Sequence, residues 1–143
     1  MGKANPEAYF RRVVIPGVIF HSMISHCSEC RPNEACGILA GKDSLVSEIF
    51  RMTNIDPSPA RYLMEPAEQF RVMTELRSRT LSMVGIYHSH PSALAYPSSR
   101  DMELAFYEEA IYIIVSLAGD EPVVKGFAIK DGASREIEII KIL

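Results

Sequence analysis

The chain alternates between short apolar runs of strand length and amphipathic segments with helical spacing, and this order restricts its fold more than any other feature. Residues 35–40 form a buried-type run that closes on Gly41, and the next run follows after a short polar turn, which predicts a hairpin. The order implies an α/β protein with a mixed β-sheet packed by helices. Strands are expected at 35–40, 45–52, 82–87, 110–117, 122–130 and 134–142, with a short one at 61–64.

Three helices are expected among these strands, at 17–31, 66–80 and 98–109. Pro32 ends the first helix, and Pro66 begins the second at its first turn. The faces expected to be buried carry Phe70, Met73 and Leu76 in the second helix and Met102, Ala105, Phe106 and Ala110 in the third. A chain of 143 residues is long enough to bury its own core, so one domain is expected over residues 1–143.

Charge and composition exclude several classes of partner. The formal net charge is -3 and no run of Lys or Arg occurs, so a nucleic-acid partner is not expected. No apolar run is long enough for a membrane span, and the first residues lack the apolar segment of a secretory signal. The three cysteines do not resemble a disulfide framework, which favours a reducing cytoplasm. The roles of Cys27, Cys30 and Cys36 stay open, since a lone C-x-x-C lacks half of a structural zinc site.

Residues 85–101, GIYHSHPSALAYPSSRD, carry the residues best suited to chemistry. His88 and His90 are two apart at the end of an expected strand, so both project to one side, whereas Ser89 points away and is assigned no chemistry. Asp101 follows at the start of a helix, where a short loop can bring it back. Two imidazole nitrogens and one carboxylate match a catalytic zinc, which keeps its fourth position for water.

Simpler interpretations of the same residues also exist. An isolated H-x-H pair is usually a chance surface pair, and S-x-x-D before an amphipathic helix is typical of a capping box. In that case Ser98 is the N-cap and Asp101 lies three residues into the helix. The capping and zinc interpretations are compatible, because Ser98 can cap the helix while Asp101 turns one oxygen toward a metal.

The complete pattern, H-x-H-x7-S-x2-D with an upstream glutamate in PNEACGILAG, resembles the JAMM or MPN-plus metalloproteases. This resemblance implies a cytidine-deaminase-like α/β/α fold and hydrolysis of amide bonds, often isopeptide bonds of ubiquitin-like proteins. It assigns Zn2+ to His88, His90 and Asp101. It makes Glu34 the general acid/base that activates a zinc-bound water, and it makes Ser98 a hydrogen-bond donor to the oxyanion.

The chain resembles the compact bacterial members of that family, because Asp101 is followed by one helix and then directly by the strand at Ala110, which leaves little room for the insertions of large deubiquitinases. Those members are associated with trimming the C-terminal Gly-Gly tail of ubiquitin-like sulfur carriers, so the resemblance implies such a protein as partner. Residues 93–96 are apolar where many relatives carry glycine or polar residues, which indicates a different preference at the rim of the site. The identity of the tail, the choice between peptide and isopeptide bonds, and the oligomeric state stay open.

Three other classes of protein share parts of this pattern. A zinc nucleobase deaminase needs H-x-E and P-C-x-x-C, and His90 stands where that glutamate would be. A RadC-like protein shares H-x-H-P and the P-S-x-x-D spacing, but the short acidic chain and the upstream PNE favour the metalloproteases. A non-catalytic MPN-type binding module would have lost metal ligands, whereas all five matching positions are intact here.

Overall fold

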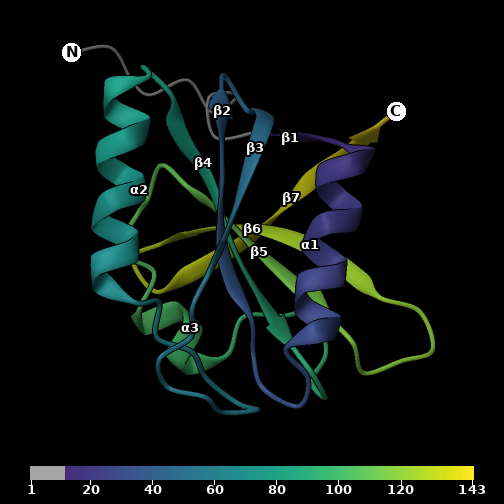
Figure 1. Ribbon diagram of the computed structural model, residues 1–143. Coiled ribbons are helices and arrows are strands. Elements are labelled where there is room, and N and C mark those ends of the chain that lie inside the picture. The colour runs from purple at the N-terminus through teal and green to yellow at the C-terminus, as the bar shows by residue number, and fades with distance from the viewer. Residues whose placement is uncertain (1–11) are drawn as a thin grey trace.

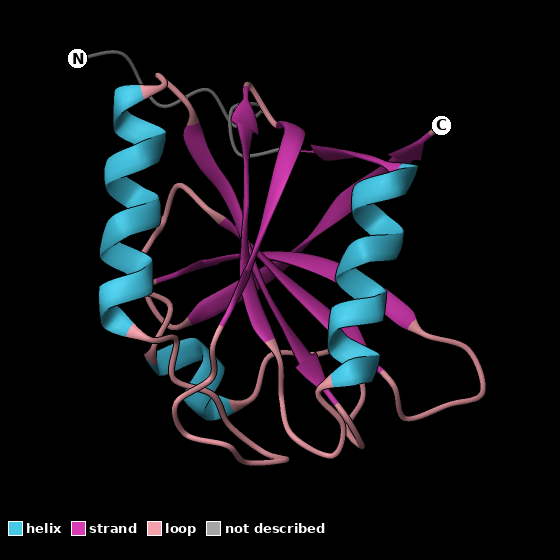
Figure 2. Ribbon diagram, viewed as in Figure 1, coloured by secondary structure: helices cyan, strands magenta, loops and turns pink. Residues whose placement is uncertain are grey.

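The computed structural model describes residues 12–143, which form seven strands and three helices around one sheet (Figures 1 and 2). The expectation of a single domain over residues 1–143 stays a prediction, and the first eleven of those residues lie outside the described part of the chain. The elements in chain order are β1 (Arg12–Pro16), α1 (Gly17–Glu29), β2 (Cys36–Lys42), β3 (Leu45–Met52), α2 (Pro66–Ser78), β4 (Ser82–His90), α3 (Ser99–Glu103), β5 (Ile111–Ser116), β6 (Val123–Lys130) and β7 (Ala133–Ile142).

The sheet is mixed, as expected, and its two ends meet through β1. The strand order is β1-β3-β2-β4-β5-β6-β7, and β1 closes the ring by pairing in parallel with both β3 and β7. The central strands β2 and β4 are antiparallel, whereas β4 and β5 run parallel. Parallel neighbours need a crossover, and the segment containing α3 supplies it between β4 and β5.

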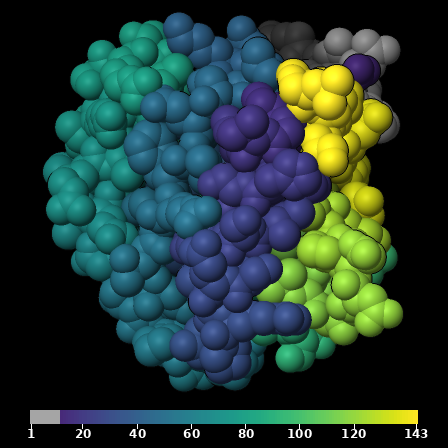
Figure 3. All heavy atoms as spheres, turned by 45° about the vertical axis from the view of Figure 1, so that its right-hand side comes forward, coloured from purple at the N-terminus to yellow at the C-terminus, as the bar shows by residue number. Residues whose placement is uncertain are grey.

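Each face of the sheet has its own apolar core, so the layers are helix, sheet and helix as the α/β/α prediction requires. Side chains such as Leu39 and Tyr87 pack with Met23 and Cys27 of α1. Alternate side chains such as Ile38 and Ile86 pack on the other face with Leu76 of α2 and with residues around α3. Figure 3 shows α1, in purple, lying across its face between the β3 region and the C-terminal strands.

Several local predictions were wrong. Strand β1 was missed because a five-residue run ending at Pro16 carries little local signal, and its pairing with β7 is a long-range contact. The helix expected at 98–109 ends at Glu103. Beyond it, the Phe106 N–H donates to the Leu104 carbonyl and the Tyr107 N–H to the Tyr112 hydroxyl, each at 3.0 Å, so neither contributes a helical hydrogen bond. Phe70 and Phe106 are 72% and 73% exposed, so they do not belong to the buried helix faces.

Two strand boundaries differ in ways that concern the site. The expected strand at 61–64 is reduced to one isolated antiparallel bridge between Asn54 and Met64. Strand β4 continues past Tyr87 to His90, so both histidines lie within the sheet and not in a loop after it. No helix among residues 12–143 is both long and apolar enough to span a membrane.

Candidate metal centre

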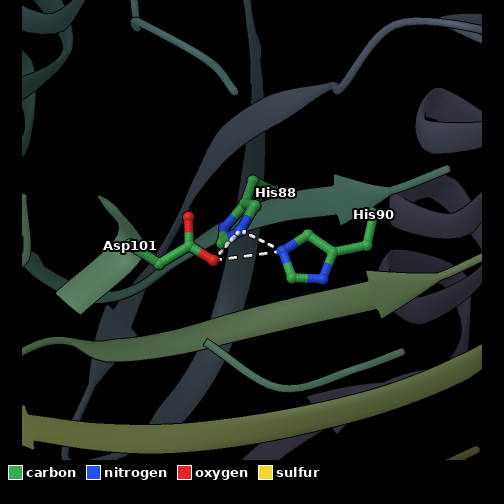
Figure 4. A group of neighbouring side chains, drawn as sticks. All are labelled: His88, His90 and Asp101. Carbon is green, nitrogen blue, oxygen red and sulfur yellow. Dashed lines mark hydrogen bonds and ion pairs between the residues drawn. The ribbon is translucent and has the colours of Figure 1, made fainter. Parts of the chain in front are cut away.

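The end of β4 brings His88 and His90 to the same face of the sheet. Their side chains alternate with those of Tyr87 and Ser89, which point toward α1. The two Nε2 atoms are 3.2 Å apart, and both rings are buried (Figure 4). The two-residue spacing therefore presents a pair of converging nitrogen donors.

Asp101 reaches this pair from the first turn of α3. Its Oδ2 atom lies 3.2 Å from His88 Nε2 and 3.0 Å from His90 Nε2 (Figure 4). The same carboxylate belongs to a capping box: Oδ2 accepts from the Ser98 N–H at 2.9 Å, and Ser98 Oγ accepts from the Asp101 N–H at 3.0 Å. Capping and convergence on the histidines thus occur together, as the sequence analysis allowed.

The charges of these three groups respond to one another. Burial lowers the pKa of His88, which favours the neutral imidazole that a metal requires. Burial also opposes the protonation of His90, but hydrogen bonds to Asp101 and to the Leu94 carbonyl outweigh it and raise the pKa. Burial alone would raise the pKa of Asp101, yet the hydrogen bonds from both histidines and the Ser98 N–H hold that pKa well below its ordinary value.

Two neighbouring residues that the sequence analysis missed orient the histidines. His90 Nδ1 donates to the backbone carbonyl of Leu94 at 2.7 Å, which leaves Nε2 facing the centre. The ring of Tyr62 stacks on His88, with centroids 4.8 Å apart and planes 28° from parallel. No local pattern could have identified Tyr62, because it comes from a loop 26 residues earlier whose position depends on the fold.

Glu34 is delivered to this side of the sheet by the pairing of β2 with β4. Cys36 pairs with His88, and just beyond it the Ser89 N–H donates to the Ala35 carbonyl while Ser89 Oγ accepts from the Ala35 N–H. Continued for one more residue, this register sets Glu34 opposite His90 and on the same face. Ser89 therefore has a structural role, and the sequence assigned it no chemistry.

The carboxyl group of Glu34 is buried and short of partners. The residue is 3% exposed, and Oε1 has no hydrogen-bond partner among the described residues. Its backbone is held on both sides, since its N–H donates to the Ser58 carbonyl at 2.8 Å and its carbonyl accepts from Asn54 Nδ2 at 3.0 Å. Burial raises the pKa of Glu34 to about 8, with a smaller opposing influence from His90 and a further rise from Asp101.

The remaining predicted residue, Ser98, is exposed, and its N–H contacts the Asp101 carboxylate of the centre at 2.9 Å. Its hydroxyl oxygen accepts the Asp101 N–H, which leaves the hydroxyl proton available to another acceptor. Cys27 is buried in the core beneath α1, and Cys36, the cross-strand neighbour of His88, is buried in the core on the other face of the sheet. Burial raises the pKa of each of these two thiols to about 12. Thiols with such a pKa are poor nucleophiles at neutral pH.

The geometry of the donor set fits a zinc ion. Ligands held tetrahedrally at about 2.0–2.1 Å from zinc lie about 3.3 Å from one another. The three donor–donor distances here are 3.0, 3.2 and 3.2 Å. These are the three residues of the described chain whose ligand atoms cluster in this way, and their two nitrogens and one carboxylate oxygen are a donor set that zinc accepts.

A mixed sheet covered by helices on both faces, with two histidines and an aspartate converging at the end of one strand, defines a candidate metallohydrolase of the JAB/MPN type. Comparison with known proteins gives the same class. Residues 16–129 match the prokaryotic homologs of the JAB domain. The chain belongs to this family.

Two characterised relatives are enzymes. The CysO-cysteine peptidase of Mycobacterium tuberculosis is 34% identical over 127 residues, which cover 87% of this chain and 87% of the relative. A desampylase of Pyrococcus furiosus is 30% identical over 111 residues, covering 78% and 79% of the two chains. Membership of this group makes the protein a JAMM-type peptidase, as predicted.

Solved structures confirm the fold. A protein from Desulfitobacterium hafniense, determined in solution, is 36% identical and superposes with a TM-score of 0.82, covering 91% of this chain and 92% of the other. A JAB1/MPN domain protein from Archaeoglobus fulgidus has a TM-score of 0.61 with 20% identity, covering 90% and 99%. The second comparison concerns the fold alone.

Proposed function

We propose that this protein hydrolyses a peptide or isopeptide bond at the C-terminal Gly-Gly tail of a ubiquitin-like or sulfur-carrier protein. The observation that carries the proposal is the convergence of His88, His90 and Asp101 beside a buried glutamate. The names of the two relatives support the substrate class, since one is a CysO-cysteine peptidase and the other a desampylase.

His88, His90 and Asp101 would hold Zn2+ in this proposal. When bound there, zinc supplies Lewis acidity toward the scissile carbonyl and lowers the pKa of water to around 7. Around this centre, Tyr62 and the Leu94 carbonyl keep the two rings in place. A cation among these ligands would also favour the ionised form of Glu34, whose pKa burial otherwise raises to about 8.

Glu34 is the proposed general acid/base. Its unpartnered Oε1 is free to accept a proton from water as the water oxygen bonds to the acyl carbon. The same proton is then delivered to the departing nitrogen as the C–N bond breaks, which yields a carboxylic acid and an amine. At neutral pH the acid loses its proton and the amine gains one, so the final products are a carboxylate and an ammonium group. Ser98 is proposed to donate its hydroxyl proton in a hydrogen bond to the carbonyl oxygen while negative charge develops on it.

An apolar hollow next to the centre supports an extended tail as substrate. It has a volume of about 170 Å³ and is lined by side chains that include Tyr62, Leu63 and Phe106. Because Tyr62 also stacks on His88, the hollow adjoins the metal centre. A tail lying along residues 61–64 would place apolar side chains in the hollow and two glycines, which have no side chains to exclude, close to the ligands.

The function is tested with carrier proteins that bear different C-terminal extensions after Gly-Gly, using intact mass to locate the cut. The expected product ends at the second glycine. Glu34→Gln should retain zinc and lose at least about two orders of magnitude in rate, the usual contribution of a positioned general base. Release of zinc by this variant, or hydrolysis at the parent rate, would show that Glu34 does not have this role.

A substitution in the substrate tests the narrow approach to the centre. Replacing the second glycine of the tail by valine should abolish cleavage through steric exclusion. Equal cleavage of the two tails would show that the channel is wide, while leaving the assignment of zinc ligands intact.

The remaining expectations concern surroundings and partners. The cytoplasm is still the expected location, and a nucleic acid or membrane partner is still not expected. The oligomeric state stays open.

A further inference from the structure

The loop between β4 and α3, residues 91–98, carries two exposed apolar side chains beside the metal centre. Leu94 is 70% exposed and Tyr96 is 52% exposed, whereas Ala95 between them is buried. Two large apolar groups facing solvent next to a reaction centre leave apolar surface that a substrate can cover.

The backbone of this loop is held firmly against the centre. The Leu94 carbonyl accepts from His90 Nδ1 at 2.7 Å and from the Tyr96 N–H at 2.8 Å. The neighbouring Ala93 carbonyl accepts from the Ser116 hydroxyl at 2.6 Å. The position of the Leu94 backbone is therefore tied to that of a proposed metal ligand.

The ring of Tyr96 is held separately, from β6. Lys125 Nζ donates to the Tyr96 hydroxyl at 2.8 Å and lies 4.4 Å from the centre of the ring. The ring also packs against Phe127, with centroids 6.1 Å apart. An aromatic side chain fixed in this way loses little entropy when it contacts a ligand, which makes it an effective contact surface.

The surroundings of the metal centre differ between its His88 side and its His90 side, so each side suits a different part of the substrate. On the His88 side lie Tyr62 and the apolar hollow, which the proposed function assigns to the tail before the cut. On the His90 side lies the loop with Leu94. A bond positioned over the centre would then direct its leaving residue toward Leu94 and Tyr96.

We infer that Leu94 and Tyr96 form the contact surface for the residue that follows the scissile bond, and that the enzyme prefers an apolar side chain there. This inference rests on the proposed function and adds the chemistry of its leaving group. Apolar contact on a partly open rim discriminates modestly, so we expect a preference of about tenfold in kcat/KM.

The test compares carriers that end in Gly-Gly-Leu with carriers that end in Gly-Gly-Asn, because leucine and asparagine are similar in size and differ in polarity. The parent enzyme should cleave the leucine form about tenfold faster. Leu94→Ser and Tyr96→Ser should each reduce the ratio of the two kcat/KM values toward one. Tyr96→Phe, which keeps the ring, should retain most of the preference.

Val18→Ser is the matched control. Val18 is 84% exposed at the start of α1, at the opposite end of the molecule from α3 (Figure 1), and its substitution should leave the ratio unchanged. Zinc content and circular dichroism would establish that every variant is folded. Equal cleavage of both carriers, or an unchanged ratio in Leu94→Ser, overturns the inference while the proposed function stands. Failure to cleave any carrier overturns the proposed function and this inference with it.

Discussion

Replacing Glu34 by glutamine should stabilise the metal-free protein at neutral pH. The carboxyl group is 3% exposed, has an oxygen without a partner in the described chain, and has its pKa raised by burial from 4.5 to about 8. At pH 7 the unfolded chain carries this group ionised, whereas the folded protein must take up a proton or bury the charge. The native group therefore opposes folding at neutral pH, and glutamine removes that cost.

The size and sign of the effect follow from the two pKa values. A folded-state pKa above the unfolded one means that the folded state binds more protons between pH 4.5 and about 8, so stability falls as the pH rises through this window. At about 1.4 kcal/mol for each pH step above 4.5, the cost reaches about 3 kcal/mol at pH 7 and is below about 1 kcal/mol at pH 5. The stability difference between Glu34→Gln and the parent should thus widen by about 2 kcal/mol between these conditions.

The assay is urea denaturation of zinc-free parent and variant at pH 5 and pH 7. Both proteins contain the same histidines and Asp101, so most of the titration of those groups cancels in the difference between them. The exception is the smallest contribution to the raised pKa of His90, which comes from Glu34 and is lost in the variant. Glu103→Gln, a substitution of an exposed glutamate in α3, is the control and should change stability by less than about 0.5 kcal/mol at either pH. A Glu34→Gln effect that is the same at both pH values would refute the argument that this carboxyl group is desolvated.

Three further predictions concern the metal and the core. Mass-spectrometric metal analysis should find about one zinc per chain in the parent. His88→Ala and Asp101→Ala should each lose most of this zinc, because each removes one of three ligands. Full zinc content in either variant would contradict the assigned centre. Zinc affinity, measured by chelator competition, should fall by about tenfold or more from pH 7.5 to pH 5.5. The reason is that the pKa of His90 is raised, so protons compete with the metal for this ring. An affinity that does not change with pH would exclude this competition. Gly37→Ala should destabilise the fold by about 1–3 kcal/mol in thermal or urea denaturation, because an added Cβ would clash with the Tyr87 ring. A hydrogen bond between the Tyr87 hydroxyl and His26 holds that ring in place. A variant as stable as the parent would show that the ring can move.

Local spacing was sufficient to predict the candidate metal ligands and most of the elements. The two-residue period of a strand sends His88 and His90 to one face whatever the rest of the chain does, and this prediction holds in β4. The capping box of Ser98 and Asp101 is likewise decided within four residues. Strand β3 was predicted with its exact bounds because apolar residues and turn signals delimit it locally.

Other features depend on contacts between segments far apart in the chain, which local spacing does not determine. The helix expected at 98–109 ends at Glu103, and the Tyr107 N–H beyond it bonds to Tyr112, a partner on the next strand. The position of Glu34 opposite His90 depends on the register between β2 and β4, and the stacking of Tyr62 on His88 depends on the path of a loop. The sequence by itself thus determined which side chains could bind a metal, because the two-residue alternation of a strand and the capping of a helix act over only a few residues. Only the tertiary structure decided what surrounds them, because the burial that shifts the Glu34 pKa and the exposure of Leu94 come from packing across the whole chain.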